Sequence, residues 1–244
     1  GVLALRGQAH VRQRWQPTVD YLNRKMQPHH FELLPLDFQM VHDAVENGVI
    51  DFLLANPAYY VQLEKRFAVD AIATLENRSS RGPQALFGSV ILQRHDDENR
   101  GIANLNGLRI GAVARNSLGG YLMAAGELLE HGVDLRQIQP AIRFYQTHDA
   151  VAYALRDREI DVGIVRTDTI ESMAQEGKFD AESVSVINAF AGGRFPFLRS
   201  TRLYPEWPLA VVRHVDRGLG KSVATALFAL EPNDPATVQG SYAG

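Results

Sequence analysis

Cysteine is absent from this chain of 244 residues. Its absence excludes disulfide bonds, thiolate nucleophiles and zinc–thiolate sites together. The lack of cysteine is consistent with a protein outside the cytoplasm, but many cytosolic proteins also have none. Composition alone therefore leaves the compartment open.

A long apolar run and a strong net charge are also missing. No apolar stretch approaches the roughly 20 residues that a helix needs to span a bilayer. The formal net charge is -3 and the pI is near 6.3, which gives no electrostatic attraction for nucleic acid or for an anionic membrane. An anionic ligand must therefore be held by local groups.

The two ends of the sequence suggest a piece of a longer protein. No signal peptide precedes the apolar start VLAL, and the sequence stops at SYAG without a closing element. We therefore expect further chain on both sides.

Hydrophobic periodicity predicts an α/β protein. Apolar runs of strand length alternate with helical patterns, as in parallel sheets covered by helices. The expected strands are 2–5, 31–36, 50–55, 70–76, 85–93, 108–113, 141–145, 160–165, 184–188 and 208–213. The expected helices are 8–26, 38–46, 57–66, 118–131, 149–156, 167–176 and 216–230. A polar connection at 94–107 separates two series, which indicates two α/β lobes.

Two glycine-containing stretches look like nucleotide sites and do not fit them. GAVARNSLGG (111–120) has only the adjacent pair Gly119 and Gly120, not the spaced glycines of a dinucleotide fold. VDRGLGKS (215–222) ends like a phosphate-binding loop, but Val215 stands where that loop needs its first glycine. Nucleotide binding is therefore disfavoured.

Three expected strand ends carry polar groups just before a helix. Ser117 precedes a glycine pair, Thr147 and His148 follow the next strand, and Arg166 and Thr167 follow the third. Helix starts have unpaired N–H groups and a partial positive charge, so they favour anions. In open α/β sheets ligands bind beyond the carboxyl ends of the strands. The alternative is that Ser117 only caps its helix and that His148 is a solvent-exposed capping residue.

Catalytic and metal sites have little support. Ser117, His148 and Asp149 suggest a triad, but no G-x-S-x-G elbow is present and adjacent His and Asp do not give its orienting geometry. His29 and His30 have no downstream partner at metal-ligand spacing, and 96–98 is typical of a solvated acidic loop. We expect no enzyme activity, no metal and no cofactor in this domain.

Four stretches carry a resemblance to a known family: VIDFLLANPAYYV (49–61), NSLGGYL (116–122) with HGVD (131–134), QTHDAVAYALRDREIDVGIVRTDTIESM (146–173) and STRLYPEWPLA (200–210). They resemble the phosphonate-binding-like branch of the type II periplasmic binding proteins, over nearly the whole chain. The last stretch is the most specific. It resembles sensor histidine kinases of the tetrathionate-sensor type.

The resemblance implies a two-lobed fold with a ligand cleft between the lobes, each lobe a mostly parallel sheet covered by helices. Lobe 1 would comprise 1–90 and 192–244, and lobe 2 would comprise 91–191, joined by two hinge strands. It also implies the ligand contacts Tyr59, Phe87, Ser117, Gly119, Gly120, Tyr121, His148, Arg166, Thr167 and Asp168. Within YPEWP (204–208), we expect Tyr204 and Trp207 to pack the hinge rather than touch the ligand.

One departure from the family pattern bears on the ligand. Phosphonate binders have a Ser-Thr-Ser-Gly turn where this chain has Ser117-Leu118-Gly119-Gly120. Two hydroxyl donors are therefore absent, each worth roughly 1.5–3 kcal/mol when bonded to a charged group. This disfavours phosphonate itself and leaves other phosphorus or sulfur oxyanions.

The resemblance then implies a periplasmic sensor domain of an inner-membrane histidine kinase that binds a small anion. Its partners would be that anion and a C-terminal membrane helix with a kinase module, with a homodimer of the full-length receptor also compatible and no nucleic acid involved. The alternative is a free-standing substrate-binding protein of an importer. An enzyme of hydrolase type is the more distant alternative.

Overall fold

A computed structural model describes residues 1–98, 101–138, 142–190 and 194–243. The chain forms two compact units, Gly1–Leu86 with Pro205–Gly244 (unit 1), and Phe87–Tyr204 (unit 2). The chain first passes from unit 1 to unit 2 between Leu86 and Phe87, slightly before the expected lobe boundary between residues 90 and 91. The return expected at 191/192 falls outside the described residues, and the chain re-enters unit 1 at Pro205. No helix of the described ranges is long and apolar enough to cross a membrane.

Unit 1 is built on a five-stranded sheet with the order β2-β1-β3-β12-β4. Its strands are β1 Val2–Leu3, β2 Pro35–Leu36, β3 Phe52–Leu54, β4 Asp70–Thr74 and β12 Pro208–Val211. β1 pairs in parallel with β2 and β3, whereas β12 is antiparallel to β3 and β4. Four strands thus run in one direction, and the reversed strand is the one that brings the chain back from unit 2.

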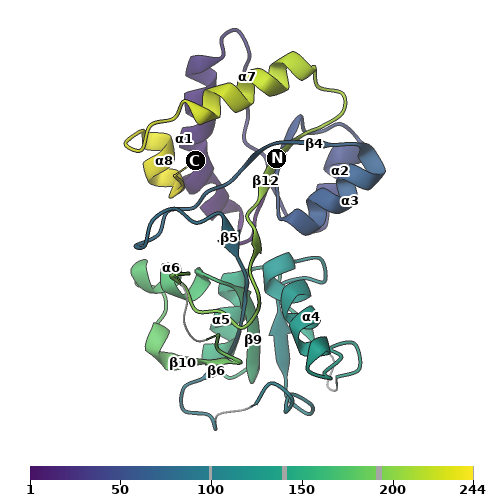
Figure 1. Ribbon diagram of the computed structural model, residues 1–244, viewed down its shortest axis with the longest axis vertical. Coiled ribbons are helices and arrows are strands. Elements are labelled where there is room, and N and C mark those ends of the chain that lie inside the picture. The colour runs from purple at the N-terminus through teal and green to yellow at the C-terminus, as the bar shows by residue number, and fades with distance from the viewer. Residues whose placement is uncertain (99–100, 139–141, 191–193, 244) are drawn as a thin grey trace. The chain divides into compact units, whose positions relative to one another are not determined.

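Helices cover both faces of the unit 1 sheet (Figure 1). They are α1 Gln8–Lys25, α2 Met40–Glu46, α3 Pro57–Phe67, α7 Arg217–Phe228 and α8 Pro235–Gly240. α1, α7 and α8 pack together around Leu22, Val223 and Ala236. The start of α3 confirms the sequence signal, because Asn56 Oδ1 accepts the N–H groups of Ala58 and Tyr59.

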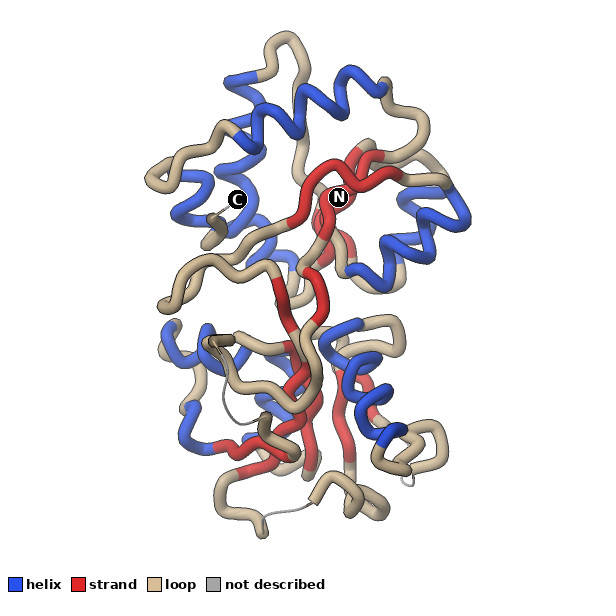
Figure 2. Tube along the Cα trace, viewed as in Figure 1, coloured by secondary structure: helices blue, strands red, loops and turns tan. Residues whose placement is uncertain are grey.

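Unit 2 has the same plan. Its sheet has the order β10-β6-β9-β7-β8, which Figure 2 shows in red, with β6 Ser89–Arg94, β7 Ile110–Ala112, β8 Arg143–Phe144, β9 Val162–Arg166 and β10 Val184–Ile187. β7 is parallel to β8 and β9, and β6 is antiparallel to β9 and β10. The expected mostly parallel sheets are therefore mixed, because each contains one reversed strand next to the boundary between the units.

Helices cover both faces of β9, and every residue of this strand is buried. Val162 and Ile164 pack with Leu128 of α4, whereas Gly163 faces Val151 of α5. The helical segments are a π-helical turn Leu118–Leu122 that continues into α4 Met123–Glu130, then α5 His148–Arg156, α6 Thr169–Gln175 and a 3₁₀ turn Ala181–Ser183. The single helix expected over 118–131 therefore begins with a wider turn.

The expected strand 85–93 is interrupted. It forms β5 Leu86–Phe87 and β6, and β5 pairs with β11 Tyr204–Pro205 in a separate two-stranded sheet. The break falls at Gly88, whose N–H donates to Thr167 Oγ1 and whose carbonyl accepts the Thr167 N–H. The backbone of Gly88 is therefore bonded to Thr167, the residue that follows β9, instead of to a neighbouring strand.

Candidate functional site

The three polar corners predicted from the sequence lie at one edge of the unit 2 sheet. β9, β7 and β8 are parallel neighbours, so their carboxyl ends point the same way. The corners that follow them are 113–117, 145–147 and 166–168. The contacts described below join these corners directly, so the expected convergence is a property of the fold.

Ser117 caps the first corner. Its Oγ accepts the N–H of Gly120 at 3.1 Å, and its carbonyl accepts the N–H of Leu122, five residues on. The N–H groups at the start of a helix have no partner within the helix, and Ser117 satisfies that of Gly120. Leu118 and Gly119 begin this wider π turn, and Gly119 is buried. π turns in helices often occur at functional sites.

The glycine pair is required by protein packing. A Cβ on Gly119 would lie 2.7 Å from Cβ of Arg166 and 3.0 Å from the Phe87 ring. A Cβ on Gly120 would lie 2.4 Å from a methyl group of Val113. Neighbouring side chains fill the space in which a Cβ of either glycine would lie. Close approach of a ligand to the glycines therefore remains a prediction.

His148 is buried and joins two corners. Its Nδ1 accepts the backbone N–H of Arg166 at 3.1 Å, and the residue is 2% exposed. The expected alternative of a solvent-exposed cap is therefore wrong, and Thr147 caps α5 instead, by accepting the N–H of Ala150. Because Nδ1 accepts here, only Nε2 carries a proton to donate, and Nδ1 cannot donate to a carboxylate as in a catalytic triad.

Arg166 is a buried cation that begins the third corner. It is 6% exposed, and its Cζ lies 4.7 Å from the centre of the Phe87 ring. Its Nε donates to Asp168 Oδ1 at 3.1 Å. The ring face and the carboxylate together fix the plane of the guanidinium, as suits bidentate recognition of an oxyanion.

The remaining predicted residues occupy different environments. Thr167 is fully buried against Gly88, and Asp168 has a left-handed backbone (φ 68) at the start of α6. Tyr121 lies in the hydrophobic core of unit 2 and packs edge-on to Phe144 at 5.5 Å. Tyr59 is buried in unit 1, where its hydroxyl donates to the Phe38 carbonyl and burial raises its pKa. Ligand contact by these residues stays a prediction.

Sequence reasoning missed a set of buried hydroxyl residues beside the corners. Ser89 Oγ donates to the carbonyl of Gly119, and its backbone N–H donates to Thr201 Oγ1 at 3.0 Å. Ser200 Oγ links the Ile91 N–H to the Ile187 carbonyl. Ser89 of the outward segment is thereby bonded to the first helix start, and Thr201 of the return segment is bonded to Ser89. The Ser-Thr pair in STRLYPEWPLA was the available signal.

The stretch 215–222, which ends like a phosphate-binding loop, forms the capped start of α7. Asp216 caps α7 by accepting the N–H groups of Gly218 and Leu219, so a carboxylate takes donors that a phosphate-binding loop would use. Within the described ranges, no group of three or more His, Cys, Asp or Glu residues is arranged to hold a metal ion.

Two α/β units whose sheets each include one reversed strand define a type II periplasmic binding protein, and solved structures of this class superimpose on the chain. The chain belongs to the family described as periplasmic substrate-binding proteins of phosphonate ABC transporters, which it matches over residues 1–241. The expected family and fold are confirmed. This is a ligand-binding family without enzymatic activity, and it identifies an extracytoplasmic domain.

Relatives of two kinds were found. The tetrathionate sensor histidine kinase TtrS of Salmonella typhimurium is 32% identical over 234 residues, which are 93% of this chain and 38% of that protein. A binding protein component of a phosphonate ABC transporter from Pseudomonas aeruginosa superimposes with a TM-score of 0.80 at 15% identity, covering 99% of this chain and 78% of that one. A Prochlorococcus marinus protein in complex with methylphosphonate gives 0.79 at 14%, covering 98% and 86%.

Proposed function

We propose that this chain is the ligand-sensing domain of a membrane-anchored two-component histidine kinase and that it binds a small oxyanion. The support for sensing is the 32% identity to a sensor kinase across 93% of the chain, which spans 38% of that kinase. Anchoring in the inner membrane and coupling to a kinase module belong to this proposal. Ligand binding would shift an equilibrium between two conformations, which requires different affinities for the two.

The observation that supports an anion is the grouping of donors at the unit 2 corners. The Arg166 guanidinium, the corner amides and the Nε2–H of His148 belong to corners that are bonded to one another, by the Gln146 N–H to the Val113 carbonyl and by the Arg166 N–H to His148 Nδ1. In a weakly acidic chain of net charge -3, these local donors supply the positive potential that an oxyanion requires.

The chemistry of the corner also narrows the ligand class. Leu118 and Gly119 contribute no hydroxyl, whereas the Ser117 hydroxyl accepts the N–H of Gly120 and keeps its own O–H as a donor. The corners therefore offer N–H donors, one hydroxyl and the guanidinium groups of Arg115 and Arg166, a set rich in donors that suits an oxyanion without a proton of its own. Sulfur oxyanions such as tetrathionate or thiosulfate meet this condition at neutral pH, and we propose this class.

Calorimetry tests the ligand directly. We expect heat of binding from one member of a panel of tetrathionate, thiosulfate, phosphate, simple phosphonates and small carboxylates, and its loss in Arg166→Met. Arg158→Met is the matched control, because this exposed arginine of unit 2 pairs with Asp96 in the loop after β6. If no anion of the panel gives heat of binding, the proposal of an anionic ligand is wrong. If both variants lose binding equally, the proposal that the ligand binds at the unit 2 corners is wrong.

A free-standing importer component is the second candidate, favoured by the description of the family. The sequence that follows Gly244 in the intact gene separates the two. A membrane-spanning run and a kinase support sensing, whereas a stop codon supports transport. Enclosure of the ligand between the two units, as the family implies, remains a prediction that solution scattering with and without ligand would test.

A further inference from the structure

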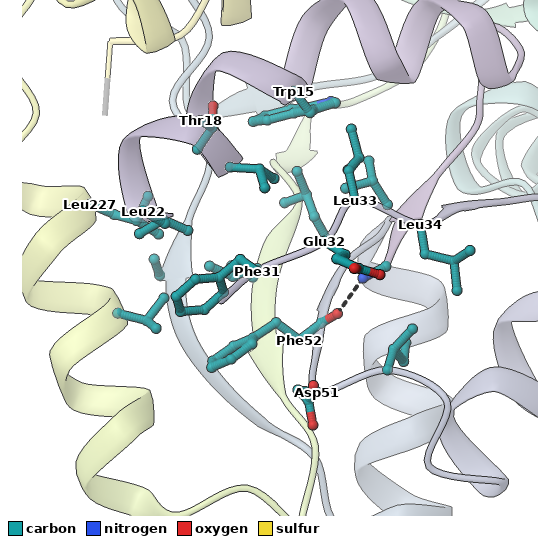
Figure 3. A pocket seen from close by; sticks show the side chains of 18 of the residues that line it. Trp15, Thr18, Leu22, Phe31, Glu32, Leu33, Leu34, Asp51, Phe52 and Leu227 are labelled. Carbon is teal, nitrogen blue, oxygen red and sulfur yellow. Dashed lines mark hydrogen bonds between the residues drawn. The ribbon is translucent and has the colours of Figure 1, made fainter. Parts of the chain in front are cut away.

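Unit 1 contains a cavity of about 850 Å³ whose lining residues all belong to that unit. Its wall combines α1, the 29–34 segment, strands β3, β4 and β12, and α7 (Figure 3). The volume lies within the ~300–1,000 Å³ typical of small-molecule sites. The cavity uses none of the corner residues of unit 2, so its role is independent of the function proposed above.

The wall of the cavity is apolar and incompletely covered. The ring centres of Phe31 and Phe52 lie 6.2 Å apart, in the same wall as Leu22 and Leu227 (Figure 3). Leu219 also lines the cavity. All of these except Leu22 are only partly buried, although they pack against the core cluster of α1 and α7. An apolar occupant would remove this surface from water, which contributes about 25 cal/mol per Å².

The polar groups of the lining include two carboxylates, two histidines and the Gly1 amino group, which donates to the Phe52 carbonyl and whose pKa is lowered by burial to about 5. Glu32 and Asp51 carry carboxylates whose side chains are 88% and 66% exposed, and the lining includes no lysine or arginine among the described residues. Each carboxylate has a histidine neighbour, His30 at 3.7 Å and His214 at 2.9 Å. The lining thus presents negative charge beside an apolar wall.

We propose that unit 1 binds a cationic amphiphile: an apolar chain or ring system with an amine or quaternary ammonium head. The chain would occupy the space between α1, α7 and the sheet, and the head would lie near Glu32 and Asp51. An anionic amphiphile of the same length would place its carboxylate among two others, which is unfavourable. The charge of the lining therefore selects the cation among molecules with equal apolar surface.

Trp15 lies in the cavity wall and provides the measurement. The chain has 2 tryptophans, and Trp207→Phe leaves Trp15 as the sole reporter. Because Trp207 Nε1 has no hydrogen-bond partner in the described structure, this change removes no bond. Titrations with decyltrimethylammonium, decanol and decanoate, below the concentrations at which each aggregates, compare three head groups on one chain.

We expect decyltrimethylammonium to bind about tenfold more tightly than decanoate, with decanol between them. Glu32→Gln with Asp51→Asn should abolish this order and leave decanol unchanged, whereas Asp20→Asn, on the exposed face of α1, should preserve it. Leu219→Phe with Leu227→Phe should weaken all three by filling the cavity, and Ser222→Phe, exposed on α7 and absent from the lining, should not.

Three results would overturn the proposal. Decanoate could bind as tightly as the cation, or none of the three could change Trp15 fluorescence. Alternatively, sedimentation could show that a second copy of the chain covers the cavity and excludes all three. Arg166→Met should leave these titrations unchanged, so failure at this cavity and failure of the anion site are separate outcomes.

Discussion

The backbone N–H of Arg166 donates to Nδ1 of His148 across 3.1 Å and thereby joins the corners after β8 and β9. A histidine nitrogen that accepts carries no proton, so the ring N–H is on Nε2 in this arrangement. The ring is 2% exposed, and loss of its acceptor would leave a buried N–H without a partner. His148 thus has a structural role that can be separated from ligand binding.

Two substitutions at His148 separate these roles. His148→Asn keeps an acceptor at the position of Nδ1 and removes the Nε2–H, whereas His148→Ala removes both. We expect Ala to lower the free energy of unfolding by about 1–3 kcal/mol through the unpaired N–H, and Asn to lower it by less. Urea unfolding measures the difference. Calorimetry should show weakened anion binding in both variants, and equal stability of the two would contradict the role of Nδ1.

Gly119 tests the packing of the corner against Arg166. In Gly119→Ala the new methyl would approach Cβ of Arg166 at 2.7 Å and the Phe87 ring at 3.0 Å, so we expect a loss of about 1–3 kcal/mol of stability and weaker anion binding. Gly126→Ala is the matched control in α4, where nothing lies within 4 Å. It should stabilise the helix by about 0.5–1 kcal/mol. Thermal unfolding of both variants measures the contrast, and a neutral Gly119→Ala would refute it.

Periodicity predicted where elements occur better than how strands pair. The capped start of α3 follows from Asn56 and Pro57 alone, because cap and proline preferences are local. The break of the expected strand at Gly88 could not be predicted from the local sequence, since it depends on Thr167, far along the chain. The π turn after Ser117 could not be predicted either, because it depends on Val113, Arg166 and Phe87 filling the space beside the glycines.

In the candidate site too, features set by local sequence were predictable and features set by distant residues were not. Strand ends followed by polar residues predicted three corners, and parallel pairing of β7 with β8 and β9 brings them together. The burial of His148 was not predictable, because a lone polar residue at a helix start gives no indication of which side chains cover it. Ser89 and Ser200 were missed for a related reason, as their partners are backbone groups of distant segments.

Asp168 sets the net charge available to an anion. Its carboxylate accepts from Arg166 Nε at 3.1 Å and so offsets part of the guanidinium charge. Asp168→Asn keeps a residue that tolerates the left-handed backbone (φ 68) and removes the negative charge. We expect anion affinity to rise about threefold to tenfold, with the gain reduced at high salt.

The control for Asp168→Asn is Asp157→Asn, the same charge change at the opposite end of α5 from His148. Its anion affinity should match that of the unmodified chain. Weaker binding in Asp168→Asn would show instead that this carboxylate supports binding, by orienting the Arg166 guanidinium or by contacting the ligand.

Asp161 makes the stability of unit 2 dependent on pH. Its side-chain hydrogen bonds from Arg109, at 3.0 Å and 2.7 Å, hold its pKa well below the ordinary value, and Arg94 contributes a further bond at 3.3 Å. A carboxyl with a lowered folded pKa stabilises the native state above its unfolded pKa of about 3.9. That contribution is lost as the pH falls through the folded pKa.

Asp161→Asn should therefore cost about 1–3 kcal/mol of unfolding free energy at pH 7, because Arg94, with a side chain only 9% exposed, loses one of its two carboxylate partners. Its curve of stability against pH should fall less steeply than that of the unmodified chain below about pH 4. Urea unfolding at several pH values measures this. Asp96→Asn, which breaks the exposed pair with Arg158, is the control and should change little. Parallel curves for Asp161→Asn and the unmodified chain would mean that the pKa of Asp161 is not lowered by folding.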